Sequence, residues 1–353
     1  MKQLPDTFLF YLGHPAHYHN VSVVIRQLAK KGYRIVLVAR AKDVLFDLLE
    51  GLPYEIVYLK PKKGQGKLSL IATVVKREFI LFRLVLKYKP KLLVGTDIVI
   101  AHVGRILGVP SVILNEDDAK EVPFLAKFGF KYATAVFSPN CCDITPYNHK
   151  KVGYEGYHEL AYLHPNYFTP DKSKVEELAG SGEKYFILRF AKLTAHHDEG
   201  KKGINLAVAK QLIAQLSPFG RVYITSERKL ETELEQYRIN ISPKNIHHAI
   251  SFAELYIGDS QTMAAEAAVL GTPSIRFNDF VGKLGYLEEL EHKYQLTFGV
   301  LSNNPEALYK KVEELLGNES LRETFHKRKE KMLMNCGDVA QIWSNYFIEN
   351  KKK

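Results

Sequence analysis

The chain has 353 residues, of which 46% are hydrophobic and 25% are charged. This length allows one large domain or two of ordinary size, and the composition excludes collagen-like, coiled-coil and largely disordered proteins. The formal net charge is +10, and residues 1–170 carry most of the excess, with 23 basic and 14 acidic residues. The three cysteines, two of them vicinal, cannot form a disulfide framework and lack zinc-site spacing.

The first residues show no targeting signal. Residues 1–6 lead into a short apolar run that ends at Gly13, which is too short for the core of a signal peptide. The most apolar stretch, residues 68–88, is interrupted by Lys76-Arg77-Glu78 and by Arg83, so we do not expect it to cross a bilayer. These features predict a cytoplasmic protein.

Short apolar runs alternate with helical patterns along the chain. Strands are predicted over residues 7–12, 33–39, 54–59, 92–95, 111–114 and 135–138, and after a restart over 185–190, 221–226, 255–258 and 274–277. Helices are predicted between most of these strands, among them 20–31, 204–216 and 263–270, and a last amphipathic helix over 339–350. Continuous apolar strands separated by helices indicate parallel sheets that are covered on both faces.

The pattern divides the chain into two domains. Residues 164–171 contain two prolines and no periodicity, which is typical of a linker. We therefore predict an N-terminal Rossmann-like domain over 1–165, a second over 172–338, and a C-terminal helix with a basic tail over 339–353 that can pack back on the first domain. The expected architecture is α/β, with two doubly wound domains facing a central cleft and ligand-binding residues directly after strands.

The segment 255–275 contains the clearest candidate site. A strand ends at Gly258, and a helix starts near Thr262 after small polar residues. The free N–H groups and the dipole of a helix start favour an anion, and the Ser260 and Thr262 hydroxyls can donate to a phosphate. Glu266 lies about one turn further on and could accept hydrogen bonds from ribose hydroxyls. The alternative is that Asp259 or Ser260 only caps the helix and Glu266 is solvated.

This segment resembles the donor-binding signature of the GT-B superfamily. It is most similar to the Asp-Ser-Gly-Gly turn and following glutamate of non-hydrolysing UDP-N-acetylglucosamine 2-epimerases, and to the corresponding turn of MurG-type glycosyltransferases. The resemblance implies that Ser260, Gln261 and Thr262 contact the diphosphate and that Glu266 contacts the ribose. Gln261-Thr262 replaces the glycine pair of the epimerases, which leaves the backbone less free to approach a diphosphate.

A second stretch, Leu193-Thr194-Ala195-His196-His197-Asp198-Glu199-Gly200, is similar to the Thr-Ala-His-Arg-Arg-Glu-Asn stretch of the epimerases. The resemblance assigns Thr194 and His196 to the donor, whereas His197 stands where an arginine is usual. Without the resemblance, a polar loop would be the simpler interpretation. Adjacent side chains point apart, so this stretch makes a poor metal site.

Three histidines follow the first predicted strand, in Gly13-His14-Pro15-Ala16-His17-Tyr18-His19-Asn20. They lie where MurG-type enzymes carry a glycine-rich loop that ends in histidine. A neutral imidazole could take a proton from an acceptor hydroxyl there. We assign this role to His17 and substrate contacts to His14 and His19. Helix capping is the structural alternative, and a metal site would lack a carboxylate at helical spacing.

Carboxylates follow two further strands. Leu92–Asp97 resembles the epimerase strand that ends in glycine and aspartate, and Glu116, Asp117 and Asp118 fall where their catalytic glutamate follows a strand. Crowded carboxylates raise one another's pKa, which suits proton transfer. We take Asp97 and Glu116 as catalytic candidates and Asp117 as a substrate contact. Helix N-capping is the alternative.

The resemblance extends over almost the whole chain. It is closest to an uncharacterised prokaryotic family of predicted glycosyltransferases that shares the Pro-Ala-His loop, the Gly-Asp-Ser-Gln-Thr turn and the connector Glu159-Leu160-Ala161-Tyr162-Leu163-His164-Pro165. It implies a glycosyltransferase that uses a nucleotide-sugar donor and a sugar or lipid-linked acceptor, with no metal or other cofactor, in polysaccharide or glycolipid synthesis. A UDP-sugar 2-epimerase-like isomerase and a non-catalytic nucleotide-sugar-binding protein are the alternatives, because one fold hosts many reactions.

Residues 60–91 (Lys60 to Lys91) hold ten basic residues and one acidic residue. The apolar part of this window is hydrophobic nearly all round, which favours a buried helix with solvated ends. The alternative is peripheral contact with an anionic membrane, since GT-B enzymes with lipid-linked acceptors dock through such a patch. No basic face interleaved with aromatic residues accompanies the charge, so nucleic acid is not an expected partner.

Overall fold

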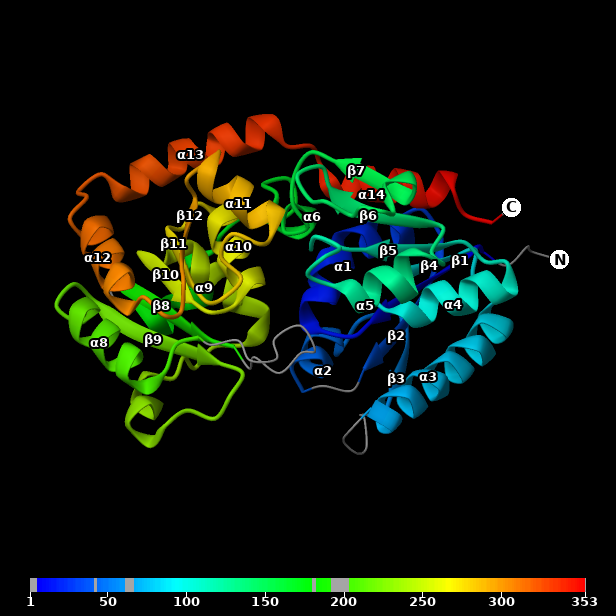
Figure 1. The fold of residues 1–353 in the computed structure, drawn as a ribbon, viewed down its shortest axis with the longest axis horizontal. Helices are drawn as coiled ribbons and strands as arrows, with labels where there is room; N and C mark the ends of the chain where they lie inside the picture. Colours follow the sequence, from blue (N-terminus) through cyan, green and yellow to red (C-terminus); the bar gives the residue numbers. More distant parts are fainter. Residues whose placement is uncertain (1–4, 41–42, 61–66, 180–181, 192–202, 353) are drawn as a thin grey trace. The chain divides into compact units, whose positions relative to one another are not determined.

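The computed structural model describes residues 5–40, 43–60, 67–179, 182–191 and 203–352. The chain divides into two compact units (Figure 1). Unit 1 consists of Met1–Tyr162 together with Gly337–Lys353, and unit 2 consists of Leu163–Cys336. The C-terminal segment therefore belongs to the same unit as the N-terminus.

Unit 1 is built on a parallel sheet. Within the described residues the sheet has seven strands in the order β3-β2-β1-β4-β5-β6-β7. The strands are β1 (Thr7–Leu12), β2 (Arg34–Arg40), β3 (Glu55–Leu59), β4 (Leu92–Gly95), β5 (Ser111–Leu114), β6 (Ala135–Pro139) and β7 (Lys151–Tyr154). Every side chain of β1, β4 and β5 is buried, which is why these strands read as continuous apolar runs.

Helices flank this sheet (Figure 1). They are α1 (Pro15–Lys30), α2 (Asp43–Leu49), α3 (Lys67–Tyr88), α4 (Ile98–Leu107), α5 (Pro123–Leu125) with the π-helical turn η1 (Ala126–Phe130), α6 (Leu160–Leu163) at the unit boundary and α14 (Val339–Glu349). Phe347 of α14 packs with ring centroids 6.5 Å from Phe10 and 5.7 Å from Phe137. Both Phe347 and Trp343 are fully buried, so α14 forms part of the core of unit 1.

Unit 2 contains a second parallel sheet. In the part of unit 2 that the structure describes, it has five strands in the order β12-β11-β10-β8-β9. The strands are β8 (Tyr185–Phe190), β9 (Arg221–Ser226), β10 (Leu255–Gly258), β11 (Ser274–Phe277) and β12 (Thr297–Val300). The helices are α7 (Glu176–Ala179), α8 (Leu206–Leu216), α9 (Ile246–Phe252), α10 (Gln261–Leu270), α11 (Gly285–His292), α12 (Pro305–Leu316) and α13 (Leu321–Asn335). The predicted α/β class with two doubly wound units is confirmed.

Each sheet has a point where the strand order reverses. In unit 1 the chain runs outward from β1 to β3 and then resumes at β4 on the other side of β1. In unit 2 the corresponding neighbours are β8 and β10. Loops that follow such neighbouring strands diverge to opposite faces and leave a crevice, where open α/β sheets bind ligands. Ligand-binding residues are therefore expected directly after β1, β4, β8 and β10.

Two helix starts differ from the prediction. Helix α1 begins at Pro15 rather than near residue 20, because proline fits the first helical position and His14 caps the helix. Helix α10 begins at Gln261, two residues before the predicted start. His17 and His19 therefore lie within the first turns of a helix, not on a loop before it.

The long helix α3 also differs in part from the prediction. Its residues Leu81, Val85 and Tyr88 are buried against the sheet, but Val75, Phe79 and Leu86 face solvent, and Phe79 is 62% exposed. The expectation of a helix buried nearly all round is therefore wrong. Among the described helices, none combines the length and the hydropathy needed to span a membrane.

Candidate functional site

The reversal point of unit 1 brings together the loops after β1 and β4. The Nδ1 atom of His17 accepts a hydrogen bond from the backbone N–H of Gly13 at 3.1 Å. The Thr96 hydroxyl oxygen lies 2.7 Å from the same nitrogen and 3.0 Å from Nε2. His14 caps α1 by accepting from the N–H of Ala16, and its ring centroid is 6.0 Å from that of His17. His14 and His17 thus occupy the place where this fold offers a ligand crevice.

The third histidine has different neighbours. The ring of His19 stacks on Tyr162 at 5.5 Å between centroids. Tyr162 belongs to the connector that the sequence resemblance singled out, so this contact fixes the connector against α1. The three histidines do not form one cluster.

The Asp97 side chain is held by two contacts at the start of α4. It caps the helix by accepting from the N–H of Val99 at 3.2 Å, and it forms an ion pair with Arg40 at the end of β2. The Arg40 guanidinium also lies over Gly13, where a Cβ atom would approach its central carbon to 3.3 Å. Burial lowers the pKa of Arg77 on α3, and repulsion from Arg40 lowers it further. The strand-end rule that identified Asp97 could also have identified Arg40.

Glu116 follows β5 and contacts a residue that the sequence did not single out. Its Oε2 lies 3.6 Å from Nδ1 of His158, and the Asn20 side-chain nitrogen lies 3.3 Å from the same atom. His158 is 2% exposed, stacks on Tyr154 and meets Trp343 edge-on at 5.0 Å. Burial lowers the pKa of His158 to about 3, so the imidazole is neutral at physiological pH. The neutral, buried ring of His158 therefore lies between Glu116 and Asn20 of α1.

The neighbouring carboxylates play distinct parts. Asp118 is buried and accepts a hydrogen bond from the N–H of Asp143 at 2.8 Å, which ties the loop after β5 to the loop after β6. The backbone oxygen of Asp117 accepts from the Asn115 side chain at 2.5 Å, and its own side chain is half-buried. Asp118 is thus a structural residue, and Glu116 and Asp117 remain the candidates for ligand contact.

The neutral state of His158 predicts a specific acid sensitivity. Unfolding restores the ring's ordinary pKa near 6.5, so the unfolded chain binds the extra proton and stability is lost as pH falls from about 6.5 towards 3. When the pH is lowered from 7 to 5, the wild type should lose about 2 kcal/mol more unfolding free energy than the His158→Gln variant.

Urea unfolding at both pH values, followed by fluorescence of the single tryptophan, Trp343, measures this difference in unit 1. His326→Gln, on the exposed face of α13 in unit 2, is the matched control. An equal acid sensitivity in wild type and His158→Gln would show that His158 is not held neutral.

In unit 2, the turn between β10 and α10 carries the predicted anion site. Ser260 caps α10 by accepting from the N–H of Met263 at 3.4 Å, and Gln261 and Thr262 form the first turn. Gly258 is required just before this turn, because a Cβ atom there would lie 2.7 Å from the Cβ of Arg189. The backbone of β10 therefore packs closely on β8 and sets the direction of the helix start.

Glu266 is buried beside α9. It is 4% exposed, and its Oε1 lies 2.9 Å from Nε2 of His247 on α9. The alternative of a solvated Glu266 is wrong. His247 was not predicted, because α9 carries no signal in the sequence that it packs against α10.

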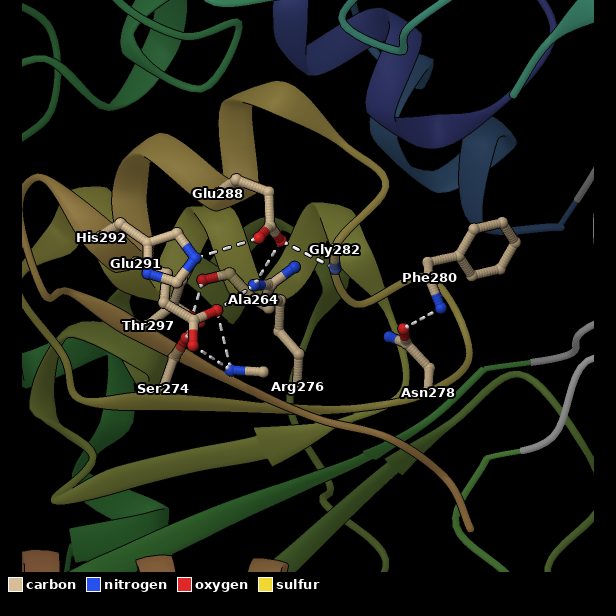
Figure 2. A network of polar contacts seen from close by, with 11 residues as sticks. Ala264, Ser274, Arg276, Asn278, Phe280, Gly282, Glu288, Glu291, His292 and Thr297 are labelled. Atoms are coloured by element: carbon tan, nitrogen blue, oxygen red, sulfur yellow. Dashed lines mark hydrogen bonds and ion pairs between the residues drawn. The ribbon is translucent and has the colours of Figure 1, made fainter. Parts of the chain in front are cut away.

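A buried ion-pair network supports the next loop along the sheet (Figure 2). The fully buried Arg276 at the end of β11 pairs with Glu291 and, at 3.3 Å, with Glu288. Figure 2 shows that Glu288 also accepts from the N–H of Gly282, at 3.0 Å. Two carboxylates thus compensate the buried charge and fix the chain that follows β11, one strand away from the α10 turn.

Thr194, His196 and His197 lie outside the described residues. In the described ranges, no group of three or more histidine, cysteine, aspartate or glutamate side chains is placed to hold a metal ion.

Comparison with known proteins identifies a family and a fold. The model of the family described as "Protein of unknown function (DUF354)" matches residues 10–348. None of the curated proteins matches this chain.

Solved structures resemble the chain over its full length. A Listeria monocytogenes protein provisionally named a UDP-N-acetylglucosamine 2-epimerase is similar with a TM-score of 0.70 and 15% identity, with 99% of each chain covered. The Neisseria meningitidis UDP-GlcNAc 2-epimerase bound to UDP-GlcNAc is similar with a TM-score of 0.64 and 12% identity, with 98% of this chain and 99% of that chain covered. Acinetobacter baumannii MurG is similar with a TM-score of 0.60 and 14% identity, with 98% of this chain and 100% of that chain covered. The chain therefore has the fold of GT-B proteins.

Proposed function

The chain belongs to the DUF354 family, whose function is unknown, and we propose that it is a nucleotide-sugar-dependent glycosyltransferase of the GT-B type. The observation that carries the proposal is the position of α10. Its start, capped by Ser260, follows β10, which pairs with β8 at the strand-order reversal of unit 2. This is where an anionic group finds both a crevice and free N–H groups.

The donor is assigned to unit 2. Ser260, Gln261 and Thr262 contact the diphosphate, Glu266 contacts the ribose, and Thr194 and His196 complete the donor site. The helix start stabilises the negative charge that develops on the leaving diphosphate, so the reaction does not depend on a metal ion. The products enter polysaccharide or glycolipid synthesis.

The acceptor is assigned to unit 1. His17 accepts the proton of the attacking hydroxyl, and Asp97 and Glu116 are the further catalytic candidates. His14, His19 and Asp117 contact the acceptor. An epimerase-like reaction is less well supported, because Asp97 already caps α4 and pairs with Arg40, which makes it a poor base at a sugar carbon.

The donor assignment predicts binding of nucleotide to the α10 turn. UDP at about 100 times its dissociation constant should stabilise the protein by about 2.7 kcal/mol and raise its melting temperature. Ser260→Ala should reduce this ligand-induced shift, because it removes the hydroxyl at the helix start. The measurement is thermal unfolding with and without UDP, GDP, CMP and TDP.

A matched variant separates binding from helix capping. Asn304 caps α12 in the same unit, at 3.1 Å from the N–H of Ala307, and its replacement by alanine should cost a similar ~1 kcal/mol of unfolding free energy. Asn304→Ala should leave the nucleotide-induced shift intact. A full shift in Ser260→Ala, or no shift with any nucleotide, would contradict the donor site.

We also propose that unit 1 contacts an anionic membrane, which would give access to a lipid-linked acceptor. Helices α3, α4 and the α5–η1 segment lie side by side (Figure 1), linked by hydrogen bonds of His102 to Glu78 and to the Phe128 oxygen. The exposed apolar residues of these elements are Val75, Phe79, Leu86, Ile106, Phe124 and Phe128. Exposed basic residues in or directly after them include Lys76, Arg83, Arg105, Lys127 and Lys131.

Exposed aromatic side chains among basic ones favour an interfacial lipid contact. Replacing both Phe79 and Phe128 by serine should weaken binding to vesicles of one-third phosphatidylserine by about tenfold or more, and salt should release the wild type. Sedimentation with anionic and neutral vesicles measures this. Phe219→Ser, an exposed phenylalanine in unit 2, is the control. Equal binding to neutral and anionic vesicles would contradict the proposal.

A further inference from the structure

Two arginine side chains come together at the reversal point of unit 1. The first, Arg40, ends β2 and forms an ion pair with Asp97, which follows β4. Its guanidinium lies over Gly13 in the loop after β1, and its central carbon is 5.9 Å from the centre of the Tyr11 ring. Because β1 lies between β2 and β4, Arg40 reaches across the end of β1.

The second arginine, Arg77, comes from α3. It lies one turn before Leu81 and two turns before Val85, which are both buried, so the three residues share the inward side of the helix. Arg77 itself is half-buried. Burial lowers the pKa of its guanidinium, the charge of Arg40 lowers it further, and Tyr11 opposes both effects. The two guanidinium groups are therefore close enough to repel each other beside Tyr11.

The neighbouring carboxylates do not balance these two positive charges. Asp97 pairs with Arg40, but no carboxylate is among the groups that affect Arg77. Glu78, the next residue in the sequence, pairs instead with His102 on α4. Within the described residues, one carboxylate thus serves two guanidinium groups. Charges that are removed from water are ordinarily paired, so this place lacks one negative charge.

Hydrogen-bond donors are also left over at this place. In the part of the chain that the structure describes, Nε of Arg40 is shielded from solvent and has no hydrogen-bond partner, and the same is true of the hydroxyl of the fully buried Tyr11. A guanidinium presents its N–H donors as a planar fork, which matches two oxygens of a phosphate. A phosphate has further oxygens for a second guanidinium, and its charge would compensate the surplus.

We propose that Arg40 and Arg77 together bind a phosphate group, which the acceptor carries as a phosphate or diphosphate ester. Gly13, over which the Arg40 guanidinium lies, donates its N–H to Nδ1 of His17 at 3.1 Å. The phosphate is therefore bound close to the proposed base. Its assignment to the acceptor rests on the proposed function, which assigns the acceptor to unit 1. A lipid-linked phosphate and a water-soluble sugar phosphate share the required chemistry.

Replacing Arg77 by glutamine tests the site without breaking an ion pair. The urea midpoint should stay unchanged or increase, because the variant removes a half-buried charge that has no carboxylate beside it. The full chain is first saturated with UDP, which fills the proposed donor site, and is then titrated with inorganic pyrophosphate in a calorimeter. The dissociation constant for pyrophosphate should be about tenfold higher or more in Arg77→Gln, because a charge-assisted hydrogen bond is lost.

Arg26→Gln is the matched control for this titration. Arg26 is an exposed arginine on α1 of the same unit, and its replacement removes the same amount of charge. It should change the dissociation constant for pyrophosphate by less than about twofold, since salt screens an exposed charge. Equal weakening in both variants would indicate general attraction to a basic protein and would overturn the inference.

Two further ligands identify the source of the phosphate. Farnesyl phosphate and glucose 1-phosphate, titrated in the same way, should both bind more weakly to Arg77→Gln than to the wild type. Tighter binding of farnesyl phosphate by the wild type would support the site with a lipid-linked acceptor. Tighter binding of glucose 1-phosphate would support it with a water-soluble acceptor.

The outcomes separate this inference from the proposed function. Pyrophosphate that does not bind the wild type, or that binds wild type and Arg77→Gln equally, would overturn the phosphate site, and binding of UDP would still support the donor site. Pyrophosphate binding that depends on Arg77, in a protein that does not bind UDP, would support the phosphate site and contradict the proposed function.

Discussion

Replacing His17 by alanine is expected to slow sugar transfer by about 10²–10⁴-fold, the usual contribution of a general base. Nucleotide binding should stay within about twofold of the wild type, because the nucleotide is assigned to unit 2 and His17 belongs to unit 1. Comparing the rate of transfer with the UDP-induced shift in melting temperature separates the two effects.

The hydrogen bonds of His17 indicate which of its ring nitrogens would accept the proton. While Nδ1 accepts from Gly13, the neutral ring carries its proton on Nε2 and is a donor. In the other neutral tautomer, Nδ1 gives up the hydrogen bond from Gly13 and donates to the Thr96 hydroxyl oxygen at 2.7 Å, and Nε2 is the nitrogen that can take a proton from an acceptor. Thr96→Val should therefore slow transfer as well, by about tenfold.

Glu116→Gln is the comparison that distinguishes the reaction classes. If the reaction is sugar transfer, Glu116→Gln should reduce the rate less than His17→Ala does. An epimerase-like reaction would instead be slowed more by the loss of the Glu116 carboxylate than by the loss of His17. Full activity of His17→Ala on the true substrate would show that the histidines after β1 are structural.

Replacing Phe347 by alanine should destabilise unit 1 by about 3–5 kcal/mol. Phe347 is fully buried and packs near the rings of Phe10 on β1 and Phe137 on β6, so its loss opens a cavity beside these two strands. Urea unfolding followed by Trp343 fluorescence measures the change.

Phe219→Ala, at an exposed position of unit 2, should change this transition by less than about 0.5 kcal/mol. A loss of less than about 1 kcal/mol in Phe347→Ala would show that α14 is only loosely attached to unit 1.

The strands could be predicted where they are buried on both faces. β1, β4, β5, β8 and β10 have the bounds expected from their apolar runs. The edge strands β3 and β9 were predicted from runs of five and six residues, whereas β7 and β12, also at sheet edges, were missed. β7 and β12 each have only four residues, of which one is a glycine and two are apolar, so neither forms a continuous apolar run.

For the candidate site, the sequence predicts which residues follow each strand but not which side chains they contact. The rule that ligands bind after parallel strands predicts His17, Asp97, Glu116 and Ser260 from the sequence alone. It could not show that Glu116 faces His158, or that Glu266 faces His247, since these partners lie 42 and 19 positions away in the sequence and meet only through packing. Such pairs have no local pattern and depend on the finished fold.

Nucleotide release from a panel of donors tests the central proposal most directly. The protein is incubated with UDP-, GDP-, CMP- and TDP-sugars, with and without a lipid extract as acceptor, and the free nucleotide and the sugar product are measured. We predict that one class of donor releases its nucleotide, that the extract accelerates release, and that His17→Ala abolishes most of it. Conversion of a nucleotide-sugar into its epimer with the nucleotide still attached, or release from none of the donors, would contradict a glycosyltransferase.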